Sequence, residues 1–300
     1  MNRRNYIQEA ERINRKFETK HFPKIRDSIK GQVDTVINAL KSGGISAAMN
    51  KAHSIIDFPG APIVQQLYRE VGLRYARKQW RQFLQQKRET RTKNVSHETL
   101  EVKGGEFGIE LKGFGFNDVW VEWLKNYLYQ FLLEKITFRV SAYTRSVLLN
   151  VLQKSIDEGW GVDKTVEALE ELPLSATQAA RIVRTEVGRA ANAGVLAASE
   201  TFEYEQSKEW ISARDARVRG NNPNDHASHV LLNSTVVDFD DYFVDPINGD
   251  RLKAPGDPGE KGRPVKPEST INCRCMAAVV AKVDERGRLI PKQKVNALST

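Results

Sequence analysis

The stretch LSATQAARIVRTEVGRAANAGVLAASETF, residues 174–202, predicts a slim helix around which other elements can pack. Ser175 and Gln178 have the spacing of a capping box, in which two side chains satisfy backbone N–H groups at a helix start. Small residues then recur along the segment: Ala190, Ala191, Ala193, Gly194, Ala197 and Ala198. Because small side chains let another backbone come near, we expect this helix to be approached closely by a neighbouring element.

Upstream of this segment, apolar residues recur at steps of three and four, as they do on one face of a helix. The pattern predicts helices over residues 25–41, 64–84, 118–131 and 143–158, and a short one that is closed by Pro173. The triplet Ser42–Gly44 should end the first helix, and Asn117 should cap the third. Residues 85–99 are polar and read as an exposed connection, and the Gly-rich residues 104–115 suit a hairpin or an irregular loop.

Downstream of Tyr204 the pattern changes to short strands and turns. The segments KEWISARD (208–215), STVVDF (234–239) and NCRCMAAVVAKV (272–283) read as strands, and the Gly/Pro-rich residues 245–270 exclude a helix or sheet interior. The expected fold class is therefore α+β, with mostly helical N-terminal two thirds followed by a small β-rich, loop-rich C-terminal lobe. The expected divisions are a helical docking region 1–98, a Gly-rich connection 99–116, a helical core 117–205, the lobe 206–283 and a flexible tail 284–300.

Composition limits the class of protein. The chain of 300 residues is 40% hydrophobic, which is enough for a substantial core, and it has no apolar run long enough for a membrane span and no secretory signal. Its two cysteines do not form a disulfide framework, so we expect a reducing cytosol and no membrane partner.

The positive charge is concentrated in one segment. The net charge of the chain is +8, and residues 74–93 hold eight basic residues and one acidic residue. A basic run beside aromatic residues suits a contact with nucleic acid or an acidic partner. The alternative is a solvated helix face that runs into a linker, which is what charge runs usually are. The candidate contact residues are Arg74, Arg77, Lys78, Arg81, Lys87 and Arg88.

The only two cysteines, Cys273 and Cys275, lie one residue apart. In a strand they would present both sulfurs on one face, which is half of a zinc site. His226 and His229 would supply the other half, with Asp215 as a spare oxygen ligand. The alternative is a core strand in which the cysteines are small apolar residues.

Five motifs in order resemble the C-terminal module of phage head morphogenesis proteins of the Mu protein F-like type. They are RIVRTEVGRAANAG at residues 181–194 with its RTE at 184–186, WISARDARVRGNNPNDHASH at residues 210–229, VVDFDDYF at residues 236–243, APGDPG at residues 254–259 and NCRC at residues 272–275. The second motif holds W-x4-D-x-R-x-R at residues 210–219 and ends at His229. The resemblance covers roughly residues 175–283. The chain departs from it where many relatives have Cys-x-x-Cys, and at the glycine that usually follows the histidine, whose turn Asn233 or Ser234 would have to make.

The resemblance implies a structural minor capsid protein and not an enzyme. Such a protein would bind the portal protein, and the major capsid or scaffolding protein, and would assist head assembly, DNA packaging or ejection. It would reside in the virion, inside the head near the portal, after assembly in the host cytoplasm, and the packaged DNA would be a further partner. Zinc, if bound, would be structural.

The charged residues of these motifs have two interpretations. Arg184, Glu186, Asp215 and Arg217 suit a buried polar network that fixes the lobe to the slim helix. The alternative makes His229 and Asp215 an acid/base or metal pair, so that the protein would be a metal-dependent nuclease or a zinc-stabilised nucleic-acid-binding protein.

Overall fold

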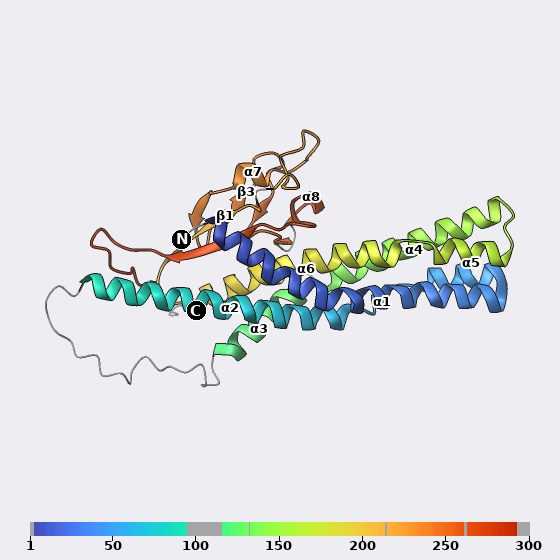
Figure 1. Cartoon of the computed structure of the whole chain (residues 1–300), viewed down its shortest axis with the longest axis horizontal. Helices are drawn as coiled ribbons and strands as arrows, with labels where there is room; N and C mark the ends of the chain where they lie inside the picture. Colours follow the sequence, from blue (N-terminus) through green and yellow to red (C-terminus); the bar gives the residue numbers. More distant parts are fainter. Residues whose placement is uncertain (1–2, 95–115, 132, 214, 261–262, 293–300) are drawn as a thin grey trace, which may run out of the picture.

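The computed structural model describes residues 3–94, 116–131, 133–213, 215–260 and 263–292. An elongated bundle of helices carries a small β-rich lobe on one side, near the N-terminus (Figure 1). The helices of the bundle are α1 (Arg3–His53), α2 (Ala61–Asn94), α3 (Phe116–Phe131), α4 (Leu133–Asp157), α5 (Val162–Glu170) and α6 (Leu174–Glu200). The α+β fold class predicted from the sequence is confirmed. None of the described helices is both long and apolar enough to cross a membrane.

Several helix ends coincide with local sequence signals, although α1 and α4 begin well before the predicted residues 25 and 143. Gly44 has a φ of 72° inside α1, which breaks the helix at the predicted Ser42–Gly44 triplet. Gly159, with a φ of 64°, ends the turn after α4, and α5 stops before Pro173. The prediction for residues 85–99 was partly wrong, because α2 continues to Asn94; the predicted Gly-rich hairpin lies outside the described residues.

The slim helix α6 lies at the centre of the bundle and packs mainly against α2 and α1. A Cβ atom added at Gly194 would lie 2.1 Å from the carbonyl oxygen of Gly72 on α2, so only glycine fits this crossing. The predicted close approach is confirmed. The predicted capping box is wrong, since Pro173 occupies the N-cap position without a side-chain cap and Gln178 instead bonds Thr144 at 3.1 Å.

One apolar core runs through α1, α2, α4, α6 and the last strand of the lobe. Phe83 of α2 and Phe202, just after α6, stack with their ring centroids 4.2 Å apart, and Trp80 meets Phe202 edge-on at 5.6 Å. Burial of this apolar area is the main stabilising term for the bundle.

The lobe is built on a three-stranded antiparallel sheet in the order β2-β1-β7. The strands are β1 (Gln206–Ile211), β2 (Val236–Asp238) and β7 (Met276–Ala281), with Trp210 opposite Ala277. The remaining elements are the two-residue ladders β3 (Phe243–Val244) with β4 (Arg251–Leu252) and β5 (Gly259–Glu260) with β6 (Arg263–Pro264), and the one-turn helices α7 (His229–Leu232) and α8 (Pro267–Thr270). Three strands were thus predicted in the right segments.

Polar side chains of the bundle reach main-chain groups of the lobe. The Asn192 side chain on α6 donates to the carbonyl oxygens of Pro255 (3.0 Å) and Cys275 (3.1 Å), and accepts from the Ala277 N–H at 2.8 Å. Tyr6 donates to the Ala277 carbonyl oxygen at 2.9 Å, which ties the start of α1 to β7. These contacts fix the strand that follows the two cysteines against the helical bundle.

Candidate metal centre

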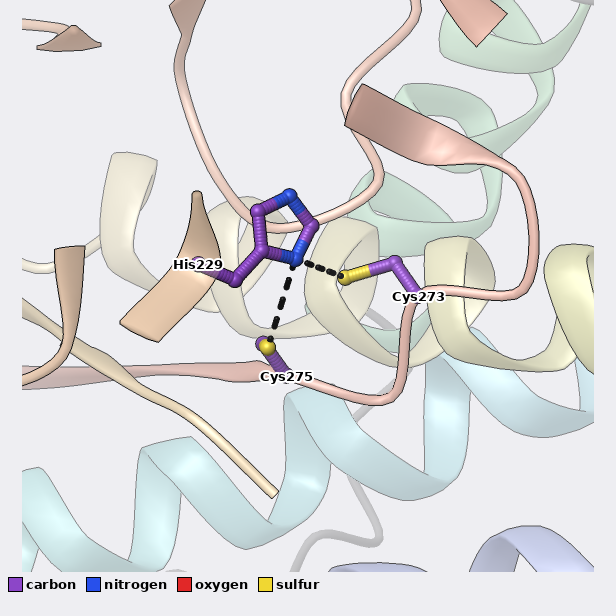
Figure 2. Close-up of side chains that lie close together, drawn as sticks. All are labelled: His229, Cys273 and Cys275. Carbon is purple, nitrogen blue, oxygen red and sulfur yellow. Dashed lines mark hydrogen bonds between the residues drawn. The ribbon is translucent and has the colours of Figure 1, made fainter. Parts of the chain in front are cut away.

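Three buried side chains of the lobe converge on one point. The Nδ1 atom of His229 lies 3.6 Å from the sulfur of Cys273 and 3.6 Å from the sulfur of Cys275 (Figure 2). All three potential ligand atoms lie within 4.8 Å of one another. The structure therefore brings together both cysteines and one of the two histidines selected from the sequence.

Local backbone geometry aims these side chains at each other. Ser228 caps α7 by accepting the N–H of Leu231 at 3.2 Å, and so places His229 in the first turn. Asn272 has a φ of 58°, a left-handed conformation that asparagine tolerates better than most residues. This turn redirects the chain just before β7.

The strand prediction for the cysteines was wrong, because β7 begins only at Met276. Cys273 and Cys275 lie in the irregular segment between the turn at Asn272 and the strand. Their sulfurs converge because the backbone turns, and not because alternate residues of a strand share a face. At the other predicted turn, Ser234 takes the left-handed conformation with a φ of 70°.

A second contact fixes the tautomer of His229. Its Nε2 atom lies 3.1 Å from the carbonyl oxygen of Ser269, which can only accept a hydrogen bond. Nε2 therefore carries the proton, and the lone pair of Nδ1 faces the two sulfurs. Histidines that bind metals commonly donate their other ring N–H to a carbonyl or carboxylate in this way.

The distances fit a tetrahedral zinc ion. Zn–S bonds of about 2.3 Å and Zn–N bonds of about 2.0–2.1 Å at a tetrahedral angle place nitrogen and sulfur about 3.6 Å apart. Both nitrogen–sulfur distances of the cluster have this value. The set of one imidazole and two thiolates is one that zinc prefers, and it would leave a fourth position for another ligand.

The two thiols titrate as a pair. The hydrogen bond from Cys275 holds the pKa of Cys273 well below its ordinary value, and the neighbouring His229 adds to this effect. The same contact, together with burial, raises the pKa of Cys275 well above its ordinary value. The pair therefore loses its first proton readily and its second with difficulty, and a bound cation would stabilise both thiolates.

The cluster belongs to the small apolar core of the lobe. Trp210 meets the His229 ring edge-on at 5.0 Å and the Phe243 ring at 5.3 Å. The buried members of this core are Trp210, Leu232, Phe243, Leu252, Val265, Cys273 and Cys275. Such a surrounding excludes water and fixes the ligand side chains in position.

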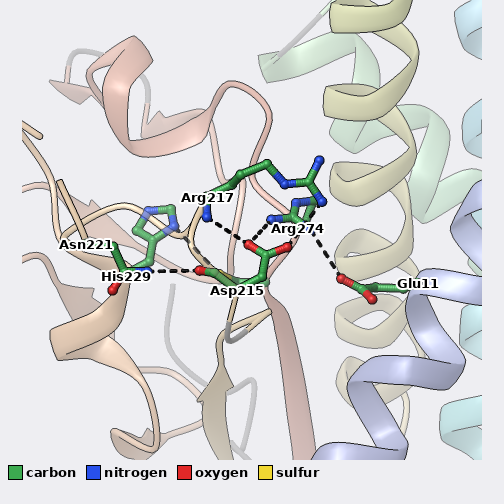
Figure 3. Close-up of polar contacts among 7 residues, drawn as sticks. Glu11, Asp215, Arg217, Asn221, His229 and Arg274 are labelled. Carbon is green, nitrogen blue, oxygen red and sulfur yellow. Dashed lines mark hydrogen bonds and ion pairs between the residues drawn. The ribbon is translucent and has the colours of Figure 1, made fainter.

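His226 and Asp215 lie outside the cluster. His226 is exposed, and its carbonyl oxygen accepts a hydrogen bond from the Asn248 side chain at 2.9 Å. Asp215 instead joins an ion-pair network with Arg274, which it contacts directly, and Arg217 at 3.2 Å (Figure 3). The bond from Arg274 is the main reason why the pKa of Asp215 is lowered to about 2.

This network links the lobe to α1. Arg274 also reaches the carboxylate of Glu11 at 3.3 Å, so one guanidinium group connects the loop at residue 215 with the first helix. The position of Arg274 between the two cysteines could have marked it as a site residue. Its partner Glu11 could not be predicted in the same way, because it is 263 residues distant.

Glu186 belongs to a different, buried network. It pairs with Arg189 at 2.8 Å and accepts a hydrogen bond from Tyr68 at 2.9 Å. Arg189 also donates to the Gly256 carbonyl oxygen at 2.8 Å and to Thr270 at 3.0 Å, both in the lobe. Sequence reasoning missed Arg189, although its i,i+3 spacing from Glu186 on a predicted helix was a usable signal.

The four predicted network residues are thus divided between two places, and Arg184 joins neither. Asp215 and Arg217 lie together at the α1 side of the lobe, and Glu186 lies under the Gly256 loop. Arg184 is half-buried and has no hydrogen bond or ion pair with any described residue.

The predicted nucleic-acid contacts all lie on α2, where they differ in exposure. Lys78 pairs with Glu9 at 2.7 Å and Lys87 pairs with Glu203 at 2.5 Å, and both lysines are half-buried. The four arginines of the set are exposed, and they recur at helical spacing: Arg74, Arg77, Arg81 and Arg88. We call these four residues the arginine stripe.

The fold and the cluster define an α+β protein whose small lobe is fixed to a helical bundle around a buried His–Cys–Cys site. Residues 146–278 match the family model described as Phage Mu protein F like protein. This match supports a phage head morphogenesis protein of the Mu protein F-like type. Neither the search of curated proteins nor that of solved structures found a match.

Proposed function

We propose that this head morphogenesis protein is a minor capsid protein that docks on the portal or the inner capsid surface and contacts packaged DNA. The observation that carries the proposal is the Mu F-like match over residues 146–278, which covers α5, α6 and most of the lobe. The role of a structural component is the one that this match supports.

The shape of the helical bundle supports a docking role. Figure 1 shows α5 and the turns beside it at the end of the bundle that lies away from the lobe. Ile156 and Val162, on either side of the turn between α4 and α5, keep 47% and 44% of their surface exposed. Apolar side chains at the end of a projecting bundle favour a contact with a protein partner.

The arginine stripe supports the contact with DNA. Its members lie three, four and seven residues apart, so they share one side of α2 over about 21 Å at 1.5 Å per residue. Guanidinium groups in a row bind backbone phosphates without reading the base sequence.

Two experiments test these roles separately. Co-expression with the portal protein of the same phage should give a complex that an Ile156→Asp/Val162→Asp variant does not form, while an Arg81→Gln variant still does. Binding of a 20-base-pair duplex should weaken steeply with salt, and Arg74→Gln/Arg81→Gln should reduce the salt slope by about 0.9 for each phosphate that is no longer neutralised. Absence of the complex with wild-type protein would refute docking on the portal.

We also propose that the His229–Cys273–Cys275 cluster binds a structural Zn²⁺. Bound zinc would crosslink α7 to the segment before β7. This structural role requires no catalytic residue beside the metal. The ion-pair engagement of Asp215 and the absence of any carboxylate from the cluster, among the described residues, favour this role over hydrolysis of a phosphodiester. A DNA-cleavage assay with added Zn²⁺ or Mg²⁺ should give no product, whereas cleavage that is abolished in His229→Ala would support the nuclease alternative.

A further inference from the structure

An arginine-lined cavity lies where the bundle meets the lobe. It has a volume of ≈310 Å³ and receives side chains from three parts of the fold that are distant in sequence. Its charged lining consists of Glu11, Arg15 and Glu18 of α1, Arg184 of α6, and Arg217 and Arg274 of the lobe. Cys273 of the metal centre also lines this cavity, but neither the metal centre nor the arginine stripe explains why four arginines gather there.

The charges of the cavity do not balance. Its carboxylates are those of Glu11 and Glu18, and Asp215 binds Arg217 and Arg274 from beside it. Four guanidinium groups therefore face three carboxylates, which leaves one positive charge unbalanced. Arg184 is half-buried with no partner among the described residues, an arrangement that costs free energy unless an anion is bound.

The lobe arginines are held in place before any ligand binds. Asp215 accepts hydrogen bonds from the backbone N–H of Arg217 at 3.0 Å and from its side chain at 3.2 Å, and it also contacts Arg274. Figure 3 shows both guanidinium groups beside this carboxylate, on the side that faces α1 and α6. Pre-positioned guanidinium groups lose little entropy when they bind an anion.

Gly188 allows the lobe to pack closely against α6 beside the cavity. A Cβ atom at this position would lie 2.9 Å from the carbonyl oxygen of Cys273, so a side chain would push the Cys273 segment away from α6. The glycine thus keeps Arg184 of α6 close to Arg274 of the lobe.

We propose that this cavity binds a phosphate group. Guanidinium groups that approach from three directions suit a tetrahedral oxyanion, which offers acceptor oxygens in several directions. The phosphate can belong to the backbone of packaged DNA or to a free phosphate-bearing molecule. The inference requires neither the bound metal nor docking on the portal.

The test is a calorimetric titration of the full chain with inorganic phosphate, at constant ionic strength set with sodium chloride. Wild-type protein should bind phosphate, and Arg184→Gln should weaken this binding at least tenfold. Arg181→Gln is the matched control, because Arg181 is an exposed arginine of the same helix that does not line this cavity. It should bind phosphate like the wild type.

A second arm separates the two sources of phosphate. Binding of a fluorescein-labelled 20-base-pair duplex that falls in Arg184→Gln but not in Arg181→Gln identifies the DNA backbone as the source. Duplex binding that is unchanged, while phosphate binding is abolished, identifies a free phosphate-bearing ligand. Arg81→Gln on the stripe should weaken duplex binding without changing phosphate binding, which separates this site from the proposed DNA contact on α2.

Equal phosphate affinity in wild type and Arg184→Gln, or no binding to either, would overturn the proposal. Arg184 makes no hydrogen bond or ion pair with a described residue, so its replacement should not lower the melting temperature without phosphate. If that variant does not fold, Arg15→Gln on α1 provides the same comparison, because Arg15 is an exposed residue of the cavity lining.

Discussion

The helical bundle and the C-terminal lobe are stabilised by different means. The bundle buries one continuous apolar core that runs through its long helices. The lobe has, beyond the sheet face that joins this core, a separate cluster of seven buried apolar residues among those described, and two of the seven are the cysteines. A unit with so few apolar residues depends more on directional contacts, and the proposed metal ion would add a crosslink to them.

The contacts between the two regions are correspondingly polar. Asn192 binds three main-chain groups of the lobe, and Arg189 binds two further lobe groups. Removal of a side chain from the bundle should therefore leave a cavity, whereas removal of one from the lobe or the boundary should leave an unpaired polar group or an open metal site. The four variants below test this difference, from the largest effect to the smallest.

Cys273→Ser/Cys275→Ser should unfold the lobe and leave the bundle folded. Structural zinc sites contribute on the order of 10 kcal/mol of binding free energy, which is as large as the stability of a typical domain. Hydrogen exchange should show reduced protection in β1 and β7 and retained protection in the α2–α6 pair. Unchanged protection of β1 in the variant would show that the two cysteines only pack as small apolar side chains and bind no metal.

Arg189→Met should destabilise the protein by about 3–5 kcal/mol, because it leaves the buried carboxylate of Glu186 without its partner. Urea unfolding measures the change, and Arg181→Met on the exposed side of α6 is the control, with a change of less than about 0.5 kcal/mol. A small effect at residue 189 would mean that this boundary does not depend on the buried ion pair.

Gly194→Ala should cost about 3 kcal/mol, because its methyl group would collide with the Gly72 carbonyl oxygen and separate α2 from α6. Gly31→Ala is the matched control in the bundle. A Cβ atom there has no atom within 4 Å, so the helix should gain about 0.5–1 kcal/mol. A thermal melt that ranks the two variants the other way would contradict the packing of α6.

Lys208→Met should stabilise the lobe by about 2 kcal/mol at pH 7. The Lys208 side chain is fully buried over the Phe239 and Phe243 rings, and its Nζ has no hydrogen-bond partner among the described residues. Burial first, and then Lys253, lower the pKa of Lys208 to about 8, while Asp257, Asp240 and Asp241 oppose the shift.

The sign of the pH effect at Lys208 follows from this pKa. Between pH 8 and the unfolded value near about 10.4, the unfolded chain holds a proton that the folded chain has released, so the free energy of unfolding rises with pH. Urea unfolding across this window should show the rise in the wild type and not in Lys208→Met. The same slope in both proteins would contradict the burial of a charged amine.

The parts of the fold that were predictable are those with local signals. Helical spacing of apolar residues, the glycine at residue 44 and the proline at residue 173 mark elements whose ends depend on a few neighbouring residues. Tertiary contacts overrode local signals at Ser175, where the expected capping box is absent. Gln178 instead accepts a hydrogen bond from Thr144 of α4. The polar residues at 85–94 continue α2 although they lack apolar spacing.

The candidate site was predictable in its residue types and not in its geometry. Two cysteines and a histidine in one lobe were sufficient to suggest a metal site, but the choice between His226 and His229 depends on the Ser228 cap and on the Ser269 carbonyl group. The pairing of Arg274 with Glu11 and of Glu186 with Tyr68 joins residues more than a hundred positions apart. A single sequence has no local signal for such contacts.

The most direct measurement is the zinc content of the native chain by elemental analysis, in wild type, His229→Ala and His226→Ala. We expect about one zinc per chain in the wild type and in His226→Ala, and its absence from His229→Ala together with the disappearance of the cooperative melt of the lobe. The exposed His226 is the matched control, since it lies outside the cluster. A wild-type chain without zinc, whose lobe melts as it does in His229→Ala, would contradict the metal centre.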